Sequence, residues 1–289
     1  MSKNIQVVVT GASGFVAKNV RKHLSQNEFN LISVSRKNFQ KLKNETKIIS
    51  SNYEAKNILP KIKNSYALIH LVGIGKQSIK NDYNSINLGF TKKIINLCKK
   101  AHIKKIIFTS GLGVSKTTSL GYFISKYRAE QQIIESGLNY TIFRPSYIVG
   151  KDDLLTKYLK NQIKTKEIEI PGSGNYSIQP IYINDVSKVI AKSLLDNKFR
   201  KKTLDLVGSE SFPFQEYVKL FSMNKIKIKK LDLEICYNDA INNPQSKLSV
   251  DDLNLLIGDF KGNHKKLSKI SKIPFESIRE LLKSGRLLQ

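Results

Sequence analysis

The sequence has little cysteine and no long apolar run. Its 289 residues include two cysteines, Cys98 and Cys236, which provide neither a disulfide framework nor the spacing of a metal site. No apolar segment approaches the ~20 residues that a membrane-spanning helix needs. The chain passes almost at once into an apolar strand, so we expect no signal peptide. These absences predict a cytoplasmic protein with reduced thiols, no bound metal and no membrane span.

Acidic residues are also scarce relative to basic ones. There are 49 Lys and Arg against 23 Asp and Glu, and the formal net charge is +26. Such a charge suits a protein that binds nucleic acid or an anionic surface. The lysines are spread through every segment, however, and the densest cluster, Lys225 to Lys230, resembles the edge strand of a sheet. We therefore expect no specific nucleic-acid partner. Binding of an anion or RNA stays open as a third, weaker hypothesis.

The first twenty residues contain a strand, a glycine turn and a helix. Ile5 to Val9 is a β-branched apolar run, typical of a buried strand, and Lys18 to Leu24 has a helical pattern. Between them, Gly11 permits a tight turn and Gly14 lets the backbone approach a pyrophosphate. An ordinary strand–turn–helix corner would look similar. The residues that we expect around the phosphates are Gly11, Ser13, Gly14, Phe15 and Val16.

A second strand, Asn30 to Ser35, ends where the adenosine ribose of a dinucleotide would lie. An acidic residue at this point binds the 2′-hydroxyl of NAD, and an arginine accommodates the 2′-phosphate of NADP. The chain has Ser35, Arg36 and Lys37 here. We therefore expect NADP(H), with NAD as the alternative, and Ser35 and Arg36 as ligands. Arg36 and Lys37 could also be two more surface cations.

Strands and helices continue to alternate along the chain. This order predicts an α/β fold with a Rossmann-type doubly wound parallel sheet. We expect an NAD(P)-binding domain over residues 1–150, its sheet completed by part of 178–207, and a smaller C-terminal lobe over 151–289. His70 lies inside an apolar strand and is expected to be a core residue. The other expected strands are 47–50, 66–72, 103–110, 138–148, 178–183 and 203–207, with a further strand and loop over 168–174. The expected helices are 52–63, 82–100, 122–134, 154–164, 186–196, 214–221, a helix that Ser249 caps, and 274–283.

The segment after the fifth strand carries a pair suited to acid–base chemistry. Tyr122 and Lys126 are four residues apart on one helical face. An ammonium group beside a phenol is expected to lower the pKa of the phenol. Such a tyrosine can exchange a proton with a hydroxyl or carbonyl while hydride moves to or from a nicotinamide.

Taken together, these motifs resemble the extended or atypical short-chain dehydrogenase/reductase superfamily, the NAD-dependent epimerase/dehydratase-like proteins. The chain is also similar to the atypical group that includes the NADPH-binding accessory subunit of respiratory complex I. The resemblance covers about residues 4 to 222. The motifs that carry it are Thr10-Gly11-x-x-Gly14-x-x-Ala17, His70-Leu71-Val72-Gly73, Asn87, Ser110, Tyr122-x-x-x-Lys126, Arg144-Pro145-Ser146 and Gln179-Pro180-Ile181-Tyr182-Ile183-Asn184-Asp185-Val186.

The resemblance implies roles for individual residues. Tyr122 would be the catalytic acid or base, Lys126 would hold the nicotinamide ribose, and Ser110 or a neighbour would orient the substrate oxygen. The smaller lobe would bind the substrate. The further cofactor-binding residues that it implies are Leu71, Val72, Gly73, Asn87, Pro145 and Ser146, and the substrate candidates, which could also be merely structural, are Tyr147, Tyr176 and Gln179.

Two departures from the family leave a second function open. Gly111 stands where the extended enzymes carry their catalytic serine, and Tyr122 follows Ser110 by only twelve positions. The leading hypothesis is an NAD(P)-dependent oxidoreductase or epimerase/dehydratase-like enzyme. The alternative is a non-catalytic NADP(H)-holding structural or regulatory protein. The substrate stays open among a sugar nucleotide, a small carbonyl compound and a quinone-linked partner, and so does assembly as a homodimer or within a protein complex.

Overall fold

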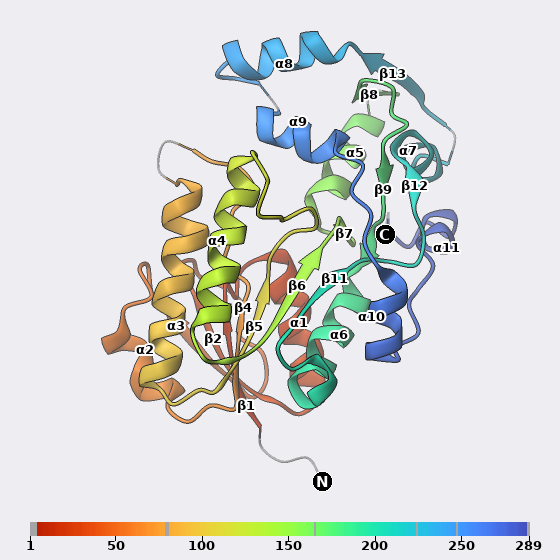
Figure 1. The fold of residues 1–289 in the computed structure, drawn as a ribbon. Helices are drawn as coiled ribbons and strands as arrows, with labels where there is room; N and C mark the ends of the chain where they lie inside the picture. Colours follow the sequence, from red (N-terminus) through yellow and green to blue (C-terminus); the bar gives the residue numbers. More distant parts are fainter. Residues whose placement is uncertain (1–4, 79–80, 165, 224, 247, 288–289) are drawn as a thin grey trace.

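A central parallel sheet dominates the molecule (Figure 1). The computed structural model describes residues 5–78, 81–164, 166–223, 225–246 and 248–287; the outermost ends of the two expected domains, 1–4 and 288–289, lie outside this range. Seven strands pair in the order β11-β6-β5-β4-β1-β2-β3, all in parallel. The predicted α/β doubly wound fold is confirmed. The strands are β1 (Gln6–Thr10), β2 (Asn30–Ser35), β3 (Glu45–Ile49), β4 (Ala67–His70), β5 (Lys105–Thr109), β6 (Asn139–Pro145) and β11 (Lys202–Leu206).

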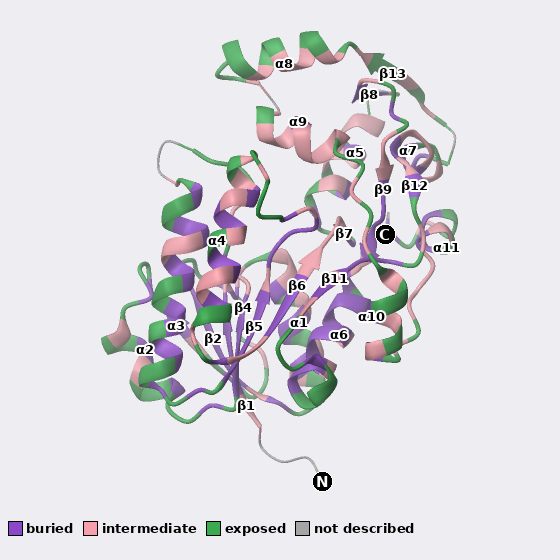
Figure 2. Cartoon of the chain, viewed as in Figure 1, coloured by how far each residue is buried: buried purple, intermediate pink, exposed green. Residues whose placement is uncertain are grey.

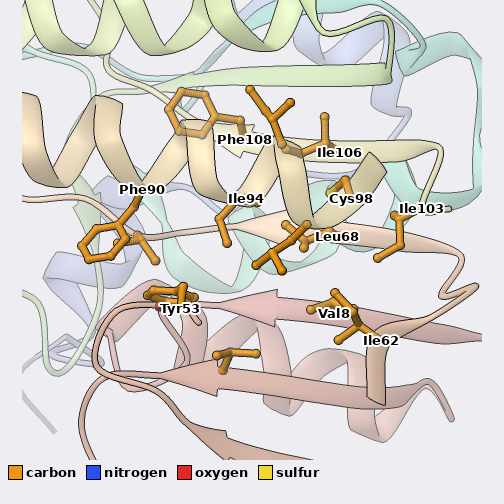
Figure 3. Close-up of a cluster of buried hydrophobic side chains, with 14 of the residues drawn as sticks. Val8, Tyr53, Ile62, Leu68, Phe90, Ile94, Cys98, Ile103, Ile106 and Phe108 are labelled. Atoms are coloured by element: carbon orange, nitrogen blue, oxygen red, sulfur yellow. The ribbon is translucent and has the colours of Figure 1, made fainter. Parts of the chain in front are cut away.

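Helices cover both faces of this sheet, and the strand residues are buried between them (Figure 2). On β1, Val8 faces one apolar cluster while Val7 and Val9 face the other, as the two-residue period of a strand requires. Figure 3 shows Val8 in the first cluster beside Leu68. The helices on that face are α2 (Ala55–Ile62), α3 (Phe90–Lys100) and α4 (Gly121–Glu135), and those on the other are α1 (Phe15–Gln26), α6 (Ile183–Leu195) and α10 (His264–Ser271).

A smaller lobe lies beyond the carboxyl ends of the strands, around a third apolar cluster (Figure 1). Its strands form three two-stranded pairs, β10 with β7, β12 with β9 and β13 with β8. Their bounds are β7 (Ile148–Val149), β8 (Glu167–Pro171), β9 (Ser177–Ile178), β10 (Ile181–Tyr182), β12 (Phe212–Pro213) and β13 (Lys227–Leu231). The remaining helices are α5 (Leu154–Ile163), α7 (Phe214–Phe221), α8 (Leu233–Asn242), α9 (Val250–Ile257), α11 (Ile278–Lys283) and the 3₁₀ turn η2 (Asn197–Phe199).

Several expected elements differ in detail. The expected strand 138–148 ends at Pro145, after which β7 pairs with β10 rather than continuing in the main sheet. The expected strand 178–183 is split around Pro180 into β9 and β10. Proline has no N–H to donate, so it interrupts a ladder of this kind. The expected helix 82–100 begins as the π-helix η1 (Asn84–Gly89) before α3.

Within the described residues, no helix is both long and apolar enough to cross a bilayer.

Candidate functional site

The chain order reverses at the centre of the sheet. From β1 the chain proceeds outward to β2 and β3, then returns to β4 on the other side of β1. Two loops diverge at such a point, and this leaves a crevice beyond the carboxyl ends of the strands, where ligands of this fold class bind. The motifs that follow β1, β2, β4, β5 and β6 therefore meet at one edge of the sheet.

The glycine turn after β1 requires glycine at its first position. Gly11 has a φ of +74°, and a Cβ there would lie 2.8 Å from the carbonyl oxygen of Leu71. Gly14 is the N-cap of α1, whose first turn begins at Phe15 with no side-chain cap and no acidic residue. Uncapped N–H groups and the helix dipole both favour an anion at this position. The turn therefore fits a dinucleotide pyrophosphate.

Groups from three other segments hold the turn in place. The amide N–H of Gly11 donates to the hydroxyl of Tyr53 over 3.1 Å. The amide N–H of Ala12 donates to the carbonyl of Val34 over 3.1 Å, and the carbonyl of Ala12 accepts from the guanidinium of Arg21 at 2.9 Å. The backbone of the turn is thus fixed without a ligand.

Arg21 is itself part of a buried ion pair. Its guanidinium donates two 2.6 Å hydrogen bonds to the carboxylate of Glu45, and both side chains are almost fully buried. The hydroxyl of Ser33 and the amide of Leu42 also donate to that carboxylate. Burial alone would raise the pKa of Glu45, but the hydrogen bonds from Arg21, Ser33 and Leu42 lower it below its ordinary value. The carboxylate stays ionised and anchors Arg21 beneath the turn.

The end of β2 lies beside the turn. The hydroxyl of Ser35 donates to that of Ser13 at 2.8 Å. Arg36 is exposed, lies over the ring of Phe90 at 5.4 Å, and reaches the side-chain oxygen of Asn81 at 3.5 Å. The structure therefore brings Ser13 and Ser35 together and leaves Arg36 facing solvent.

Gly73, Asn87 and Lys126 meet after β4. Asn87, in the π-helix η1, accepts from the amide of Ile74 at 2.9 Å and donates to the carbonyl of Ile74 and to the hydroxyl of Ser125. A Cβ on Gly73 would lie 2.9 Å from the Nζ of Lys126 and 3.2 Å from the Oδ1 of Asn87. π-Helical turns are frequent at functional sites. Here the turn supplies the asparagine that fixes the loop around Lys126.

Lys126 is buried, with its ammonium near the carboxyl end of β5. Its Nζ donates to the carbonyl of Thr109 at 3.1 Å. Burial lowers the pKa of Lys126 to about 8, against an opposing effect of Glu130. Glu130 in turn accepts two hydrogen bonds from Arg144.

Tyr122 lies one helical turn before Lys126 and has aromatic neighbours. Its ring is 5.8 Å from that of Tyr83 and 5.4 Å from that of Phe123. Burial raises the pKa of Tyr122 to about 12. The expected lowering by Lys126 is therefore wrong: loss of solvation accounts for the shift, and the charge of Lys126 is not among its causes. The phenol is protonated at neutral pH.

Position 111 directly faces the Tyr122 hydroxyl. A Cβ on Gly111 would lie 3.2 Å from that oxygen, so a side chain here would meet the phenol of Tyr122. Ser110, which was predicted to orient the substrate oxygen, is buried directly after β5. Its hydroxyl has no hydrogen-bond partner in the described part of the chain.

His70 has the environment expected of a core residue. Its two ring nitrogens lie 2.8 Å from the hydroxyl of Thr10 and 3.2 Å from that of Thr91. Burial, together with the charge of Lys126, lowers the pKa of His70 to about 3. The imidazole is therefore neutral, and each of its ring nitrogens has a hydroxyl partner.

The end of β6 joins the main sheet to the smaller lobe. The carbonyl of Pro145 accepts from the amide of Leu112 at 2.8 Å, and the amide of Ser146 donates to Leu206 at 3.3 Å. The hydroxyl of Ser146 donates to the carbonyl of Gln179. These contacts place Pro145 and Ser146 beside the loop that contains Gly111.

The three substrate candidates differ in their surroundings. The amide of Gln179 donates to Gly208 at 2.9 Å and accepts from Gly262 at 2.8 Å, so both of its polar atoms are used within the chain. Tyr147 and Tyr176 pack against the lobe's apolar cluster. Burial raises the pKa of both phenols. The Tyr176 hydroxyl is buried without a partner among the described residues.

Segments near the C-terminus approach the residues on either side of Tyr122, a proximity that sequence reasoning missed. Phe260 packs edge-on against Phe123 at 5.3 Å and occupies the space beside Gly113. Asp251, in the first turn of α9, has a carboxylate oxygen 3.8 Å from the Cβ position of Gly121. No motif marks these residues.

Within the described residues, no three His, Cys, Asp or Glu side chains gather closely enough to hold a metal ion.

Comparisons with curated proteins show distant relatives. The yeast UPF0659 protein YMR090W (Saccharomyces cerevisiae) is 28% identical over 233 residues, which cover 74% of this chain and 98% of that protein. Prestalk A differentiation protein A of Dictyostelium discoideum is 26% identical over 62% of the chain, which spans 56% of its length. Subunit 9 of the rat NADH dehydrogenase [ubiquinone] 1 alpha subcomplex is 23% identical over 76% of the chain, which spans 61% of that subunit.

A solved structure shares the fold, and a family model matches more than half of the chain. The structure of MoeE5 in complex with UDP-glucuronic acid and NAD superposes with a TM-score of 0.77 over 96% of both chains, at 16% identity, and so shows the shared fold. The NAD(P)H-binding family model matches residues 11–197, well over half of the chain. The chain therefore belongs to the NAD(P)H-binding family.

Proposed function

We propose that this protein is an NADP(H)-dependent oxidoreductase or epimerase-like enzyme in which Tyr122 moves the proton. The observation that carries the proposal is the buried ammonium of Lys126. It lies against Thr109 and Gly73, one helical turn from Tyr122. A cation fixed there can bind the ribose hydroxyls of a nicotinamide nucleotide whose pyrophosphate rests on the Gly11 turn.

The protonated state of Tyr122 fits the acid step of a carbonyl reduction. Its pKa of about 12 keeps the proton on the phenol at neutral pH. When bound, the nicotinamide supplies or accepts the hydride. Tyr122 donates its proton to the substrate oxygen, and the ammonium of Lys126 stabilises the phenolate that this leaves.

The test compares Tyr122→Phe with Tyr127→Phe, a tyrosine on the same helix, against carbonyl compounds and sugar nucleotides. We expect Tyr122→Phe to lose at least about 100-fold in turnover, the lower range of general acid–base catalysis. Both variants should bind NADPH within about twofold of wild type, because neither substitution touches the glycine turn. Equal turnover in Tyr122→Phe and wild type would contradict the proposal.

A second function rests on Gly111. Without a side chain at this position, the Tyr122 hydroxyl lacks the neighbour that the extended enzymes place there. One relative is named as a subunit of mitochondrial NADH dehydrogenase. The chain would then hold NADP(H) as a structural part of a complex. Cofactor that survives purification, together with no turnover of any substrate tested and association with a larger assembly, would favour this function.

A further inference from the structure

A cavity of about 440 Å³ lies at the opposite end of the sheet from the glycine turn. Its wall comes from the α3–β5 loop, the α4–β6 loop and the start of β11, at the lower end of the sheet in Figure 1. The volume is within the range of small-molecule sites. The residues that line it are Cys98, Lys99, His102, Ile103, Lys104, Gly137, Leu138, Asn139, Arg200 and Lys201.

The lining carries charge of one sign. Lys99 and Lys104 come from the end of α3 and the loop after it, Arg200 and Lys201 come from the turn before β11, and no carboxylate among the described residues belongs to the lining. Over the described ranges, none of these four side chains forms an ion pair. Because the fold brings them together from distant positions, they are not one local run of lysines. Four unpaired cations around one hollow attract an anion.

Asn139 indicates that a ligand of this cavity also carries a hydrogen-bond donor. Its side-chain oxygen is buried and has no hydrogen-bond partner in the part of the chain that is described. A buried acceptor without a partner is unfavourable, so a hydrogen-bond donor on a ligand would satisfy it. The apolar side of the hollow is formed by Cys98, Ile103 and Leu138, which are buried; Cys98 and Ile103 lie close together at one end of the cluster in Figure 3.

We propose that this cavity binds a small phosphorylated molecule that also carries hydroxyl groups, such as a sugar phosphate. The phosphate meets the four cations, and a hydroxyl donates to Asn139. The strands β5 and β6 separate this site from the cofactor site, because Lys104 and Asn139 stand at their amino ends and Ser110 and Pro145 at their carboxyl ends. The site does not depend on the proposed reaction.

The test measures binding of ribose 5-phosphate and of inorganic phosphate by calorimetry at ~0.15 M salt, a typical physiological ionic strength. NADPH is added in excess so that phosphate cannot report on the glycine turn. The variant Lys104→Ala/Arg200→Ala/Lys201→Ala is compared with Lys265→Ala/Lys266→Ala/Lys269→Ala on α10. The second variant removes the same charge from exposed positions away from the cavity.

We expect saturable binding that weakens at least tenfold in the cavity variant and changes less than twofold in the α10 variant. Asn139→Leu should weaken ribose 5-phosphate but not inorganic phosphate. The proposal is wrong if wild type binds neither probe saturably, or if the two triple variants lose affinity equally, which would indicate diffuse surface charge. It is also wrong if only a short RNA is bound through these residues. Thermal unfolding of each variant verifies that it is folded.

Discussion

The glycine turn and the surroundings of Tyr122 differ in how completely the chain satisfies its own polar groups. In the turn, the amides of Gly11 and Ala12 and the carbonyl of Ala12 all have partners. Near Tyr122, the hydroxyl of Ser110 is buried without a partner among the described residues, and position 111 carries no side chain. The cofactor half, around the glycine turn, is therefore organised before any ligand binds, whereas the half around Tyr122, where we propose the reaction, leaves a buried hydroxyl unpaired among the described residues.

This difference has a functional consequence. A preorganised cradle binds without a large ordering cost, which favours tight cofactor binding. A reaction centre with fewer fixed groups accepts more varied substrates but stabilises a transition state less well. The two halves can be tested separately, because different residues support them.

The largest expected effect is the loss of stability when the Arg21–Glu45 ion pair beneath the glycine turn is broken. Arg21→Ala leaves the carboxylate of Glu45 buried without its partner, which costs about 3–5 kcal/mol of unfolding free energy. Arg36→Ala is the matched control, since Arg36 is exposed and its loss should cost less than about 0.5 kcal/mol. Chemical denaturation of both variants measures the difference. Similar stabilities would mean that the ion pair does not hold the turn.

Lys126 lies between the glycine turn and Tyr122, and the pH dependence of stability tests how deeply its ammonium is buried. Its pKa is about 8 in the folded protein and 10.5 as the ordinary value, so between these values the unfolded chain binds more protons. Folding stability attributable to Lys126 therefore rises with pH across this window. Relative to Lys126→Met, wild type should gain roughly 3 kcal/mol from pH 8 to pH 10.5, at about 1.4 kcal/mol per pKa unit. Parallel stability curves for the two proteins would show that the ammonium is not buried.

Substitution of Gly11 should separate binding from folding. In Gly11→Ala the new Cβ meets the carbonyl of Leu71 at 2.8 Å in a backbone conformation that favours glycine. We expect NADPH affinity to fall at least about 100-fold, or about 2.7 kcal/mol. Gly75→Ala is the control, because nothing in the described part of the chain lies within 4 Å of a Cβ there. Titration calorimetry of both variants measures the affinities. Equal values would contradict the prediction that the Gly11 turn binds the cofactor.

Much of this fold could be predicted because its strands are β-branched apolar runs, and the segments between them have the periodicity of helices. The pattern failed at Pro145 and Pro180, where apolar residues continue but the pairing partner changes. It also missed α8, in which no residue is buried. The π-helix around Asn87 keeps a helical composition, so nothing in the residues marks its different hydrogen bonding.

The site was harder to predict than the fold. A signal for Arg21 was present, since Ala17, Val20, Arg21 and Leu24 form the buried face of α1, and a cation on such a face requires a partner. The identity of that partner, Glu45, could not be read from spacing. The pKa of Tyr122 was predicted in the wrong direction because the distance along a helix does not reveal how far a phenol is removed from water.

The smallest expected effect concerns which nucleotide the cradle prefers. Arg36 is exposed at the end of β2, with its guanidinium over Phe90, where it can reach a 2′-phosphate without rearranging the turn. We expect NADP(H) to bind at least about tenfold more tightly than NAD(H), a difference of about 1.4 kcal/mol, and Arg36→Ala to abolish that preference alone. Lys37→Ala should reduce it less, because an ammonium lacks the planar fork that clamps a phosphate. Calorimetric titration with all four nucleotides distinguishes the outcomes: if Arg36→Ala weakens NADH as much as NADPH, Arg36 supports the cradle in general and does not select the 2′-phosphate.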